Sequence, residues 1–356
     1  MFRWGIFGTG AVARKFALGL AAAADMRAAI VASRNPENAQ RFATGLGLDA
    51  APSYEQAAGA DVDAVYIATP PSEHRRHALL CLEAGKPVLI EKPFAATADD
   101  ARAIIMAAAE RNLFCMEAMW TRFLPLTRAL KKAVADGTIG EPRAFAGAFC
   151  AADLPDAARN LFNPAMGGGA LLHRGVYPLS LACHLLGPVV EIMGTARIGD
   201  TGVDEDVSLS LAHESGALST VRASLRANAP LDAVLSGTQG TIRIDAPIFR
   251  PFRMHLARTT PRAGDARAGG RFEALKEGTL LQTAQQRLDV LVRALRGQGG
   301  KPVLHAYAGN GYHYQAEEAR MRIRAGERES PTMPLVESLH IVEVMETARA
   351  QWSRAS

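Results

Sequence analysis

A glycine-rich turn near the amino terminus constrains the fold of this chain more than any other feature. A short apolar run at residues 4–7 leads into G-T-G-A-V-A at residues 8–13, and a helical pattern follows over residues 12–24. Gly8 allows a tight turn, Gly10 lets a phosphate approach the backbone, and Ala13 allows close helix packing. Because N–H groups at a helix start attract negative charge, this pattern predicts a dinucleotide site. A glycine turn without a ligand is the alternative.

Strand and helix patterns alternate from this turn onward. Further apolar runs at 28–32, 63–69, 87–90 and 113–116 are separated by helical segments at 39–46, 54–58, 74–84 and 97–111, and another helix follows from 125 to about 137. Such alternation is typical of a doubly wound parallel sheet. We therefore predict an α/β Rossmann domain over residues 1–122.

The pattern changes after residue 142. Runs at 143–149, 189–198, 205–212, 218–225, 232–236 and 241–244 alternate apolar and polar residues, with a tight connection at 236–241. They predict an α+β domain over residues 123–356 with a large open, mostly antiparallel sheet. We expect a loop at 260–270 and helices at 283–297, 313–325 and 335–350, which could pack back on the first domain.

The second strand ends in Ser33-Arg34-Asn35. An NAD site usually has an acidic residue here to bind the ribose hydroxyls, whereas NADP requires a group that accommodates a 2′-phosphate. Arginine binds phosphate through paired, charge-assisted hydrogen bonds. The sequence therefore favours NADP(H), with NAD(H) as the second choice and a merely solvated arginine as the alternative.

Lys92 follows the buried run at 87–90, within Glu91-Lys92-Pro93. A lysine at the carboxyl end of a parallel strand faces the crevice where such sheets bind ligands, and Pro93 stiffens its support. An ordinary surface lysine is the alternative. His74, in the first turn of the helix after the third strand, is either part of this site or a capping or surface residue.

A second group of polar residues follows the glycines at 167–169. His173 and Tyr177 are four residues apart on an apolar helical stretch that continues to residue 186, so both side chains are expected on one face. Taken alone, they are better explained as hydrogen-bonded core residues.

Composition excludes several classes of protein. Hydrophobic residues make up 48% and charged residues 21% of the 356-residue chain, which is typical of a soluble globular protein. The net charge of +4 is dispersed, which argues against nucleic-acid binding. No apolar run is long enough to span a membrane. The chain enters a strand at its start, and its four cysteines are well separated, so we expect a cytoplasmic protein. His74 and His77 lack accompanying carboxylates or thiols, and we predict no metal site.

Together these motifs resemble the glucose–fructose oxidoreductase and inositol dehydrogenase superfamily (Gfo/Idh/MocA). The resemblance rests on the glycine turn, Glu91-Lys92-Pro93, the run E-A-M-W-T-R-F at 117–123, the segment 167–178, and S-P-T-M-P-L at 330–335. The runs M-W-T-R-F at 119–123 and M-P-L at 333–335 are most similar to the branch that contains trans-1,2-dihydrobenzene-1,2-diol dehydrogenase. The resemblance covers nearly the whole chain.

The resemblance implies an oxidoreductase that moves a hydride between nicotinamide and a secondary alcohol, diol or sugar-like polyol. It implies that Lys92 approaches the nicotinamide, that Tyr177 is the acid/base, and that the open sheet forms a homodimer or a dimer of dimers. That branch typically has an aspartate where this chain has His173.

From the residue chemistry, we expect the Lys92 cation to lower the pKa of Tyr177 and His173, titrating near neutrality, to relay the proton. A dinucleotide-binding sensor that has lost catalysis is the alternative function, and an enzyme that uses His173 alone as its base is a third. The expected catalytic residues are Lys92, Tyr177 and His173. The expected cofactor-binding residues are Gly8, Thr9, Gly10, Ala11, Val12, Ser33, Arg34, Thr69, Pro70, His74, Glu91, Lys92, Trp120 and Arg122.

We predict that Arg34→Ala weakens binding of NADP much more than binding of NAD, because only NADP carries the phosphate that the guanidinium would contact. Fluorescence titration of the reduced cofactors measures both affinities. Equal losses for the two cofactors, or a wild-type protein that prefers NAD, would contradict the assignment.

Overall fold

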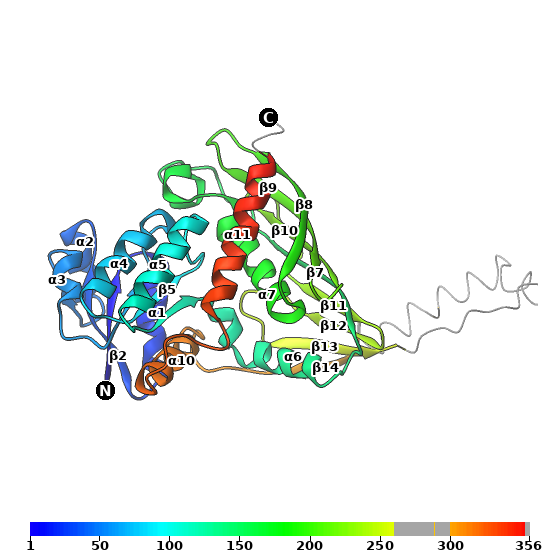
Figure 1. The fold of residues 1–356 in the computed structure, drawn as a ribbon, viewed down its shortest axis with the longest axis horizontal. Coiled ribbons are helices and arrows are strands. Elements are labelled where there is room, and N and C mark those ends of the chain that lie inside the picture. The colour runs from blue at the N-terminus through cyan, green and yellow to red at the C-terminus, as the bar shows by residue number, and fades with distance from the viewer. Residues whose placement is uncertain (260–287, 289–299, 353–356) are drawn as a thin grey trace, which may run out of the picture.

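The computed structural model describes residues 1–259, 288 and 300–352. The expected loop at 260–270 and, apart from Leu288, the expected helix at 283–297 lie outside the described residues. Figure 1 shows two sheets with helices packed between them.

The first sheet is parallel throughout and has the strand order β3-β2-β1-β4-β5-β6. Its strands are β1 (Phe2–Phe7), β2 (Met26–Ala32), β3 (Asp49–Ala50), β4 (Ala64–Ile67), β5 (Val88–Glu91) and β6 (Cys115–Ala118). The strand order reverses between β1 and β4, which is where open α/β sheets bind their ligands. The predicted doubly wound sheet is confirmed.

Helices connect these strands and begin at residues suited to helix starts. They are α1 (Ala11–Gly19), α2 (Pro36–Thr44), α3 (Tyr54–Ala58), α4 (His74–Glu83), α5 (Ala98–Glu110) and α6 (Pro125–Ala135), with 3₁₀ turns η1 (Leu20–Ala22), η2 (Pro71–Glu73) and η3 (Trp120–Phe123). The Asn35 side chain caps α2 and the Thr97 hydroxyl caps α5, each accepting a backbone N–H. The first helix was expected to continue to residue 24, but it tightens into η1 after Gly19.

The second sheet has the order β14-β13-β12-β11-β7-β10-β9-β8, and every pairing except the parallel β7–β10 pair is antiparallel. Its strands are β7 (Pro142–Cys150), β8 (Val189–Ile198), β9 (Asp204–His213), β10 (Leu218–Ser224), β11 (Ala233–Gly237), β12 (Gly240–Ile244), β13 (Arg253–Arg258) and β14 (Lys301–Leu304). Sequence patterning missed β13 and β14. Pro302 interrupts the strand signal of β14, yet an edge strand tolerates a proline.

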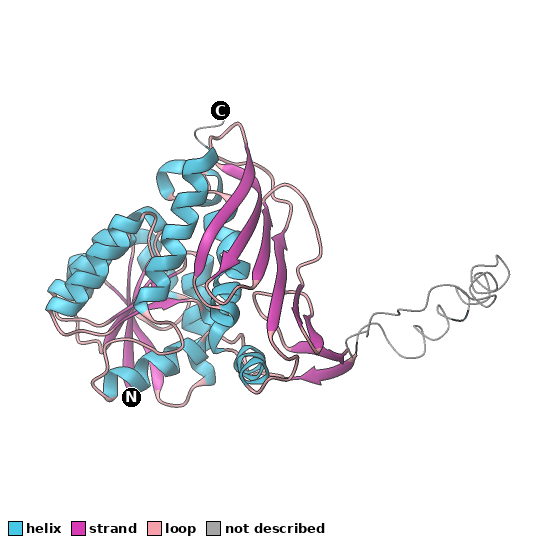
Figure 2. Cartoon of the chain, turned by 45° about the vertical axis from the view of Figure 1, so that its right-hand side comes forward, coloured by secondary structure: helices cyan, strands magenta, loops and turns pink. Residues whose placement is uncertain are grey.

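The remaining helices are α7 (Val176–Leu186), α10 (His313–Arg324) and α11 (Leu335–Trp352), with short 3₁₀ turns η4 (Asn160–Phe162) and η5 (Pro164–Met166). Two of them, α7 and α11, lie against one face of this second sheet (Figure 2), whereas α10 packs on the first domain. Helix α11 contacts β8 on one side and α5 and β6 on the other, and α10 packs on η1 and η3. The C-terminal helices therefore pack back on the parallel sheet. The proposed domain boundary after residue 122 falls between β6 and β7.

The helix that carries His173 and Tyr177 is not a uniform α-helix. A π-helical turn, η6 (Leu171–Gly175), comes first and α7 follows to Leu186, with Gly187 in a positive-φ conformation at its end. A buried carboxylate, Asp204, accepts the backbone N–H of Leu171 at 2.7 Å and so caps the start of this segment. Among the described helices, none combines the length and hydropathy needed to cross a membrane.

Candidate active site

The glycine turn between β1 and α1 forms an open cradle at the start of a helix. Gly8 has φ +105°, and a Cβ there would lie 2.6 Å from the Ala68 carbonyl oxygen, so only glycine fits. Gly10 is the N-cap of α1 without a side-chain cap, and a Cβ built on it meets no atom within 4 Å. The exposed N–H groups of Ala11 and Val12 therefore border free space, as binding of an anionic pyrophosphate requires.

Two further arginines lie beside this turn. A cavity of about 460 Å³ is lined by Thr9, Gly10, Ala11, Arg14, Asn38, Arg41 and Phe42. Sequence reasoning missed Arg14 and Arg41, although a basic residue one turn after the glycine motif could have indicated the first. At the end of β2, Ser33 accepts a hydrogen bond from Thr9 at 3.4 Å, and Arg34 is exposed next to it. The structure thus gathers the expected Ser33 and Arg34 at the same sheet edge as the glycine turn.

The end of β4 is organised by two buried histidines. Arg76 can only donate, so His77 accepts at Nε2 and donates from Nδ1 to the Thr69 hydroxyl at 2.9 Å. His74 is fully buried, with its ring nitrogens 3.0 Å from the Pro93 oxygen and 2.9 Å from the Thr69 oxygen. Burial lowers the pKa of His74 to about 4, although the carbonyl oxygens oppose this change, so the neutral ring donates to one of the two carbonyls at a time.

His74 therefore joins the ends of β4 and β5 through the backbone, and its expected direct contact with a cofactor is not supported. The alternative of a surface role is also wrong. Thr69 and Pro70 remain at the sheet edge.

At the end of β5, a buried carboxylate precedes Lys92. Glu91 accepts hydrogen bonds from the Tyr66 hydroxyl and from the Lys92 N–H, and burial raises its pKa to about 7. Glu117, at the end of β6, accepts the Phe94 N–H at 3.1 Å, and burial also raises its pKa to about 7. Burial lowers the pKa of Lys92, while the two carboxylates oppose that change. The Lys92 ammonium thus lies near two buried carboxyl groups, which stand at the ends of the neighbouring strands β5 and β6.

Lys92 and Tyr177 meet between the two sheets. The Lys92 Nζ lies 5.0 Å from the centre of the Tyr177 ring and donates to the His173 backbone oxygen at 3.0 Å. Tyr177 is 9% exposed, and its hydroxyl accepts a hydrogen bond from the Trp120 indole at 3.4 Å. Two residues 85 positions apart in the chain thus form one contact, as the sequence predicted.

The expected lowering of the Tyr177 pKa is not found, because other influences outweigh the Lys92 charge. Burial raises the pKa of Tyr177, and the Glu91 carboxylate raises it further, while the Trp120 hydrogen bond opposes them. The physical reason is geometric, since the ammonium lies over the face of the ring while the hydroxyl points toward Trp120. Tyr177 is therefore a neutral phenol at physiological pH.

His173 also differs from its expected state. Its Nε2 lies 3.1 Å from the Gly167 carbonyl oxygen, which can only accept, so Nε2 carries the proton and Nδ1 is free to accept. Burial and the Lys92 charge lower the pKa of His173 to about 3, so it does not titrate near neutrality. Among the described residues no hydrogen bond joins His173 to Tyr177. The π-turn between them changes the spacing that an α-helix would have given.

Trp120 belongs to this group of residues, whereas Arg122 does not. The Trp120 ring stacks on Tyr312, with centres 4.5 Å apart. Arg122 is 1% exposed and donates to Ser180 on α7, to the Thr332 oxygen, and to Glu337 on α11 at 2.7 Å. Its guanidinium is fully engaged in joining η3 to two helices. The expectation that Arg122 binds the cofactor is corrected accordingly, because the fold directs this side chain inward.

Comparison with known proteins agrees with this arrangement. A family model described as "Oxidoreductase family, NAD-binding Rossmann fold" matches residues 2–119, and a model of the GFO/IDH/MocA C-terminal domain matches residues 127–243. The trans-1,2-dihydrobenzene-1,2-diol dehydrogenase of Mus musculus is 31% identical, covering 98% of this chain and 96% of that protein. The D-xylose 1-dehydrogenase (NADP(+)) of Hypocrea jecorina is 29% identical over 98% of this chain and 91% of that protein.

Solved structures share the fold. A 3-ketoreductase from Actinomadura kijaniata in complex with NADP and TDP-benzene superposes with a TM-score of 0.78 and 22% identity, covering 98% of this chain and 97% of that one. The aldose–aldose oxidoreductase of Caulobacter crescentus gives a TM-score of 0.79 and 22% identity, covering 100% and 98% of the two chains.

We predict that Arg122→Gln lowers the free energy of unfolding by about 3 kcal/mol, because it leaves Glu337 without its partner in a largely buried pair. Affinity for NADPH in the folded protein should stay within about twofold. Urea unfolding and cofactor titration measure the two quantities, with Arg143→Gln, at an exposed pair with Glu141, as the control that changes neither. A loss of cofactor affinity at unchanged stability would restore the binding role that the sequence suggested.

Proposed function

The chain belongs to the Gfo/Idh/MocA oxidoreductase family, and on that basis we propose that it is an NADP(H)-dependent dehydrogenase or reductase acting on CH–OH groups of a diol, sugar or sugar-like polyol. The observation that carries this proposal is the Lys92 ammonium seated against Tyr177 at the carboxyl end of β5. The NADP-linked relatives and the exposed Arg34 beside Ser33 support the choice of cofactor. NAD(H) is the second choice.

The glycine turn suits a dinucleotide because it leaves backbone N–H groups open beside Gly10. Ala11 and Val12 would donate to the pyrophosphate, Ser33 and Arg34 would bind the adenosine ribose and its phosphate, and Thr69 and Pro70 would line the nicotinamide side. When bound, the nicotinamide supplies or accepts the hydride.

Lys92 supplies positive charge where the substrate oxygen becomes negative. An ammonium fixed by the His173 oxygen and supported by Glu91 and Glu117 needs little reorganisation when that charge develops. Because the surroundings are buried, its charge is less screened than at the surface. We propose that Lys92 holds the substrate oxygen and stabilises its alkoxide character.

Tyr177 is placed to transfer a proton to or from the substrate oxygen. Its oxygen already accepts from Trp120, so its own hydrogen is free to point toward a substrate oxygen. A raised pKa keeps that proton in place at neutral pH, which suits donation during carbonyl reduction. His173 is neutral and its Nδ1 is free, so it would accept a hydrogen bond from a substrate hydroxyl and orient that group. This role replaces the proton relay that the sequence analysis expected.

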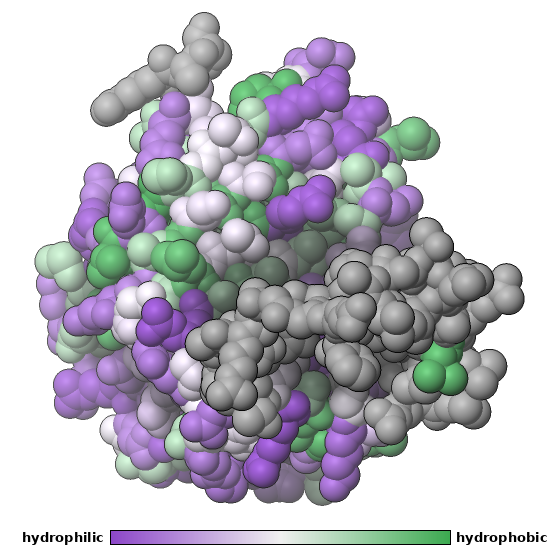
Figure 3. Space-filling view, turned by 90° about the vertical axis from the view of Figure 1, so that its right-hand side faces the viewer, coloured by the Kyte–Doolittle hydropathy of each residue, from purple (hydrophilic) through white to green (hydrophobic). Residues whose placement is uncertain are grey.

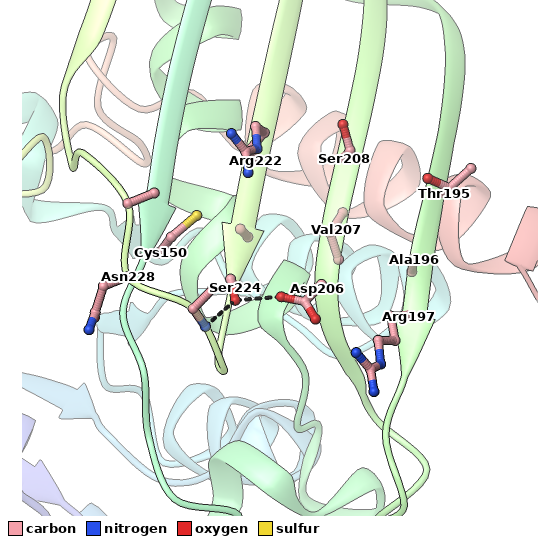
Figure 4. A pocket seen from close by; sticks show the side chains of 13 residues that line it. Cys150, Thr195, Ala196, Arg197, Asp206, Val207, Ser208, Arg222, Ser224 and Asn228 are labelled. Atoms are coloured by element: carbon pink, nitrogen blue, oxygen red, sulfur yellow. Dashed lines mark hydrogen bonds between the residues drawn. The ribbon is translucent and has the colours of Figure 1, made fainter.

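We also propose that the second sheet mediates a homodimer or a dimer of dimers. Its face opposite the helices carries small exposed side chains such as Ala144, Ala146 and Thr220, together with the 62% exposed Met193. Figure 3 shows weakly polar and apolar surface on this side of the molecule. A cavity of about 380 Å³ on this face is bordered by Arg197, Arg222 and Asp206, the last accepting a hydrogen bond from Ser224 (Figure 4). A flat sheet face of this kind allows close approach of a second copy.

Light scattering should find Ala146→Asp as a single chain of 37.9 kDa, whereas the wild type and the exposed-helix control Ala109→Asp should have at least twice that mass. The introduced carboxylate would face its own copy across a two-fold axis and be desolvated there. A monomeric wild type would contradict the proposed assembly.

The four cysteines are buried and unpaired, which supports a cytoplasmic location for this protein.

We predict that Tyr177→Phe and Lys92→Ala each lower kcat about 10²- to 10⁴-fold, since each removes a group that acts on the reacting oxygen. NADPH oxidation and NADP reduction, followed by fluorescence on a panel of diols, aldoses and their carbonyl products, measure turnover. The affinity for NADPH should change less than about threefold in Tyr177→Phe, and Tyr314→Phe on α10 serves as the matched control. Turnover that survives in Tyr177→Phe would remove the proposed acid/base. A wild type that binds NADPH but turns over no compound of the panel would favour the sensor.

A further inference from the structure

The cavity beside the glycine turn is bordered by positive charge and by hydrogen-bond donors. Its volume is about 460 Å³, and it lies between α1, which contributes Arg14, and α2, which contributes Arg41. No aspartate or glutamate is among the residues that line it in the described part of the chain. Two guanidinium groups without an acidic neighbour in the lining attract an anion to this cavity.

Arg41 and Asn38 lie one turn apart on α2 and face this cavity together. The Arg41 guanidinium donates to the side-chain oxygen of Asn38. Because that bond engages the oxygen of the Asn38 amide, its NH₂ group is left as a donor, and the Arg41 guanidinium keeps further N–H groups of its own. This pair therefore offers donors to an anion from α2.

Arg14 reaches the same cavity from α1. A Cβ built on Gly45 would lie 3.7 Å from the Arg14 Nη1, so this guanidinium extends across the space between the two helices. No described residue forms a hydrogen bond or an ion pair with the Arg14 side chain. Arg14 and Arg41 are both exposed, so each can turn toward a bound anion without breaking a buried contact.

The cavity adjoins the place proposed for the adenosine ribose. Thr9 and Gly10 line it, and they also belong to the turn that would hold the pyrophosphate. Thr9 donates to Ser33 at the end of β2 at 3.4 Å, and the ribose 2′-oxygen is bound at this strand end in dinucleotide folds. A phosphate on that oxygen would therefore lie beside the first two turns of α2, within reach of the cavity.

We propose that Arg14, Asn38 and Arg41 hold the 2′-phosphate of NADP(H) and thereby select it over NAD(H). This inference rests on the proposed function, and it adds specificity-determining residues on two helices to Arg34, which does not line the cavity. A phosphate group carries nearly two negative charges and three acceptor oxygens, so it can bind more than one guanidinium. The hydroxyl of NAD(H) at the same position would gain little from these cations.

Calorimetric titration with 2′,5′-ADP and with 5′-AMP tests the proposal without turnover, because only the first compound carries the 2′-phosphate. We expect Arg14→Gln and Arg41→Gln each to weaken binding of 2′,5′-ADP about tenfold, and the double variant to weaken it further, since each change removes charge-assisted hydrogen bonds. Binding of 5′-AMP should change less than about twofold in the same variants, because its phosphate would lie at the glycine turn.

Lys15→Gln is the matched control. Lys15 follows Arg14 on α1 and is exposed, but it does not line the cavity, so this change removes one positive charge from the same helix without touching the site. Both affinities should stay within about twofold of the wild type. Arg41→Lys keeps the charge but loses the paired geometry of the guanidinium, so its affinity for 2′,5′-ADP should fall between wild type and Arg41→Gln. Circular dichroism checks the fold of each variant.

Three results of the titration would overturn the proposal. The first is a double variant that binds 2′,5′-ADP as tightly as the wild type does. The second is an equal loss for 5′-AMP, which would assign the arginines to the 5′-phosphate instead. The third is an equal loss in Lys15→Gln, which would show a general effect of surface charge and no specific site.

Turnover separates this inference from the proposed function. The ratio of kcat/KM for NADPH to kcat/KM for NADH should fall about tenfold in Arg14→Gln and in Arg41→Gln, and stay unchanged in Lys15→Gln. An active wild type whose ratio is the same in all variants overturns this inference and leaves the proposed function in place. A wild type without oxidoreductase activity contradicts the proposed function, while the titration with 2′,5′-ADP still decides the role of the two arginines.

Discussion

The site depends on one half-buried positive charge held between two sheets. Lys92 leaves the end of β5 and is fixed from the other domain by a helix carbonyl and an aromatic ring. An ammonium in such a setting is costly unless it is hydrogen-bonded and opposed by negative charge. The carboxylates of Glu91 and Glu117, at the ends of β5 and β6, provide that negative charge. The relative placement of the two sheets therefore determines whether Lys92 can exist as a cation at the place where chemistry is expected.

The same burial sets the protonation states around that charge. Burial raises the pKa of Tyr177 and lowers the pKa of His173 and His74. All three shifts favour the neutral form, because the surroundings of each group solvate ions poorly. In the proposed site, the Lys92 ammonium then supplies the positive charge, and the Tyr177 phenol beside it is the proposed proton donor. This division between a charged group and a neutral donor is what carbonyl reduction needs, since one stabilises the oxygen and the other protonates it.

The helix that carries these residues is shaped by small departures from regularity. Asp204 caps its first turn, and glycines at 167–169 let it approach Pro71 and Asp204 closely. The His173 carbonyl oxygen in its π-turn accepts a hydrogen bond from Lys92 of the other domain. Arg122 ties the same helix to η3 and α11 by hydrogen bonds to Ser180 and Glu337. Each contact fixes the helix relative to the parallel sheet, and Tyr177 on this helix thereby meets Lys92 of the other domain.

The sequence by itself determined the elements whose signals are local. The glycine turn, the strand periodicities and the glycine-flanked helix placed most strands and helices, and they placed Lys92 and Tyr177 at element ends or faces that could meet. Tertiary structure decided what depends on neighbours distant in the chain. The direction of the Tyr177 pKa follows from burial beside Glu91, and the inward turn of Arg122 follows from partners more than fifty residues away. The tautomer of His173 follows from its hydrogen bond to the Gly167 carbonyl oxygen, in the glycine segment 167–169 that precedes the helix. Burial and hydrogen-bond partners are properties of the packed chain, so a residue type and its spacing could name the candidates but could not assign their protonation states.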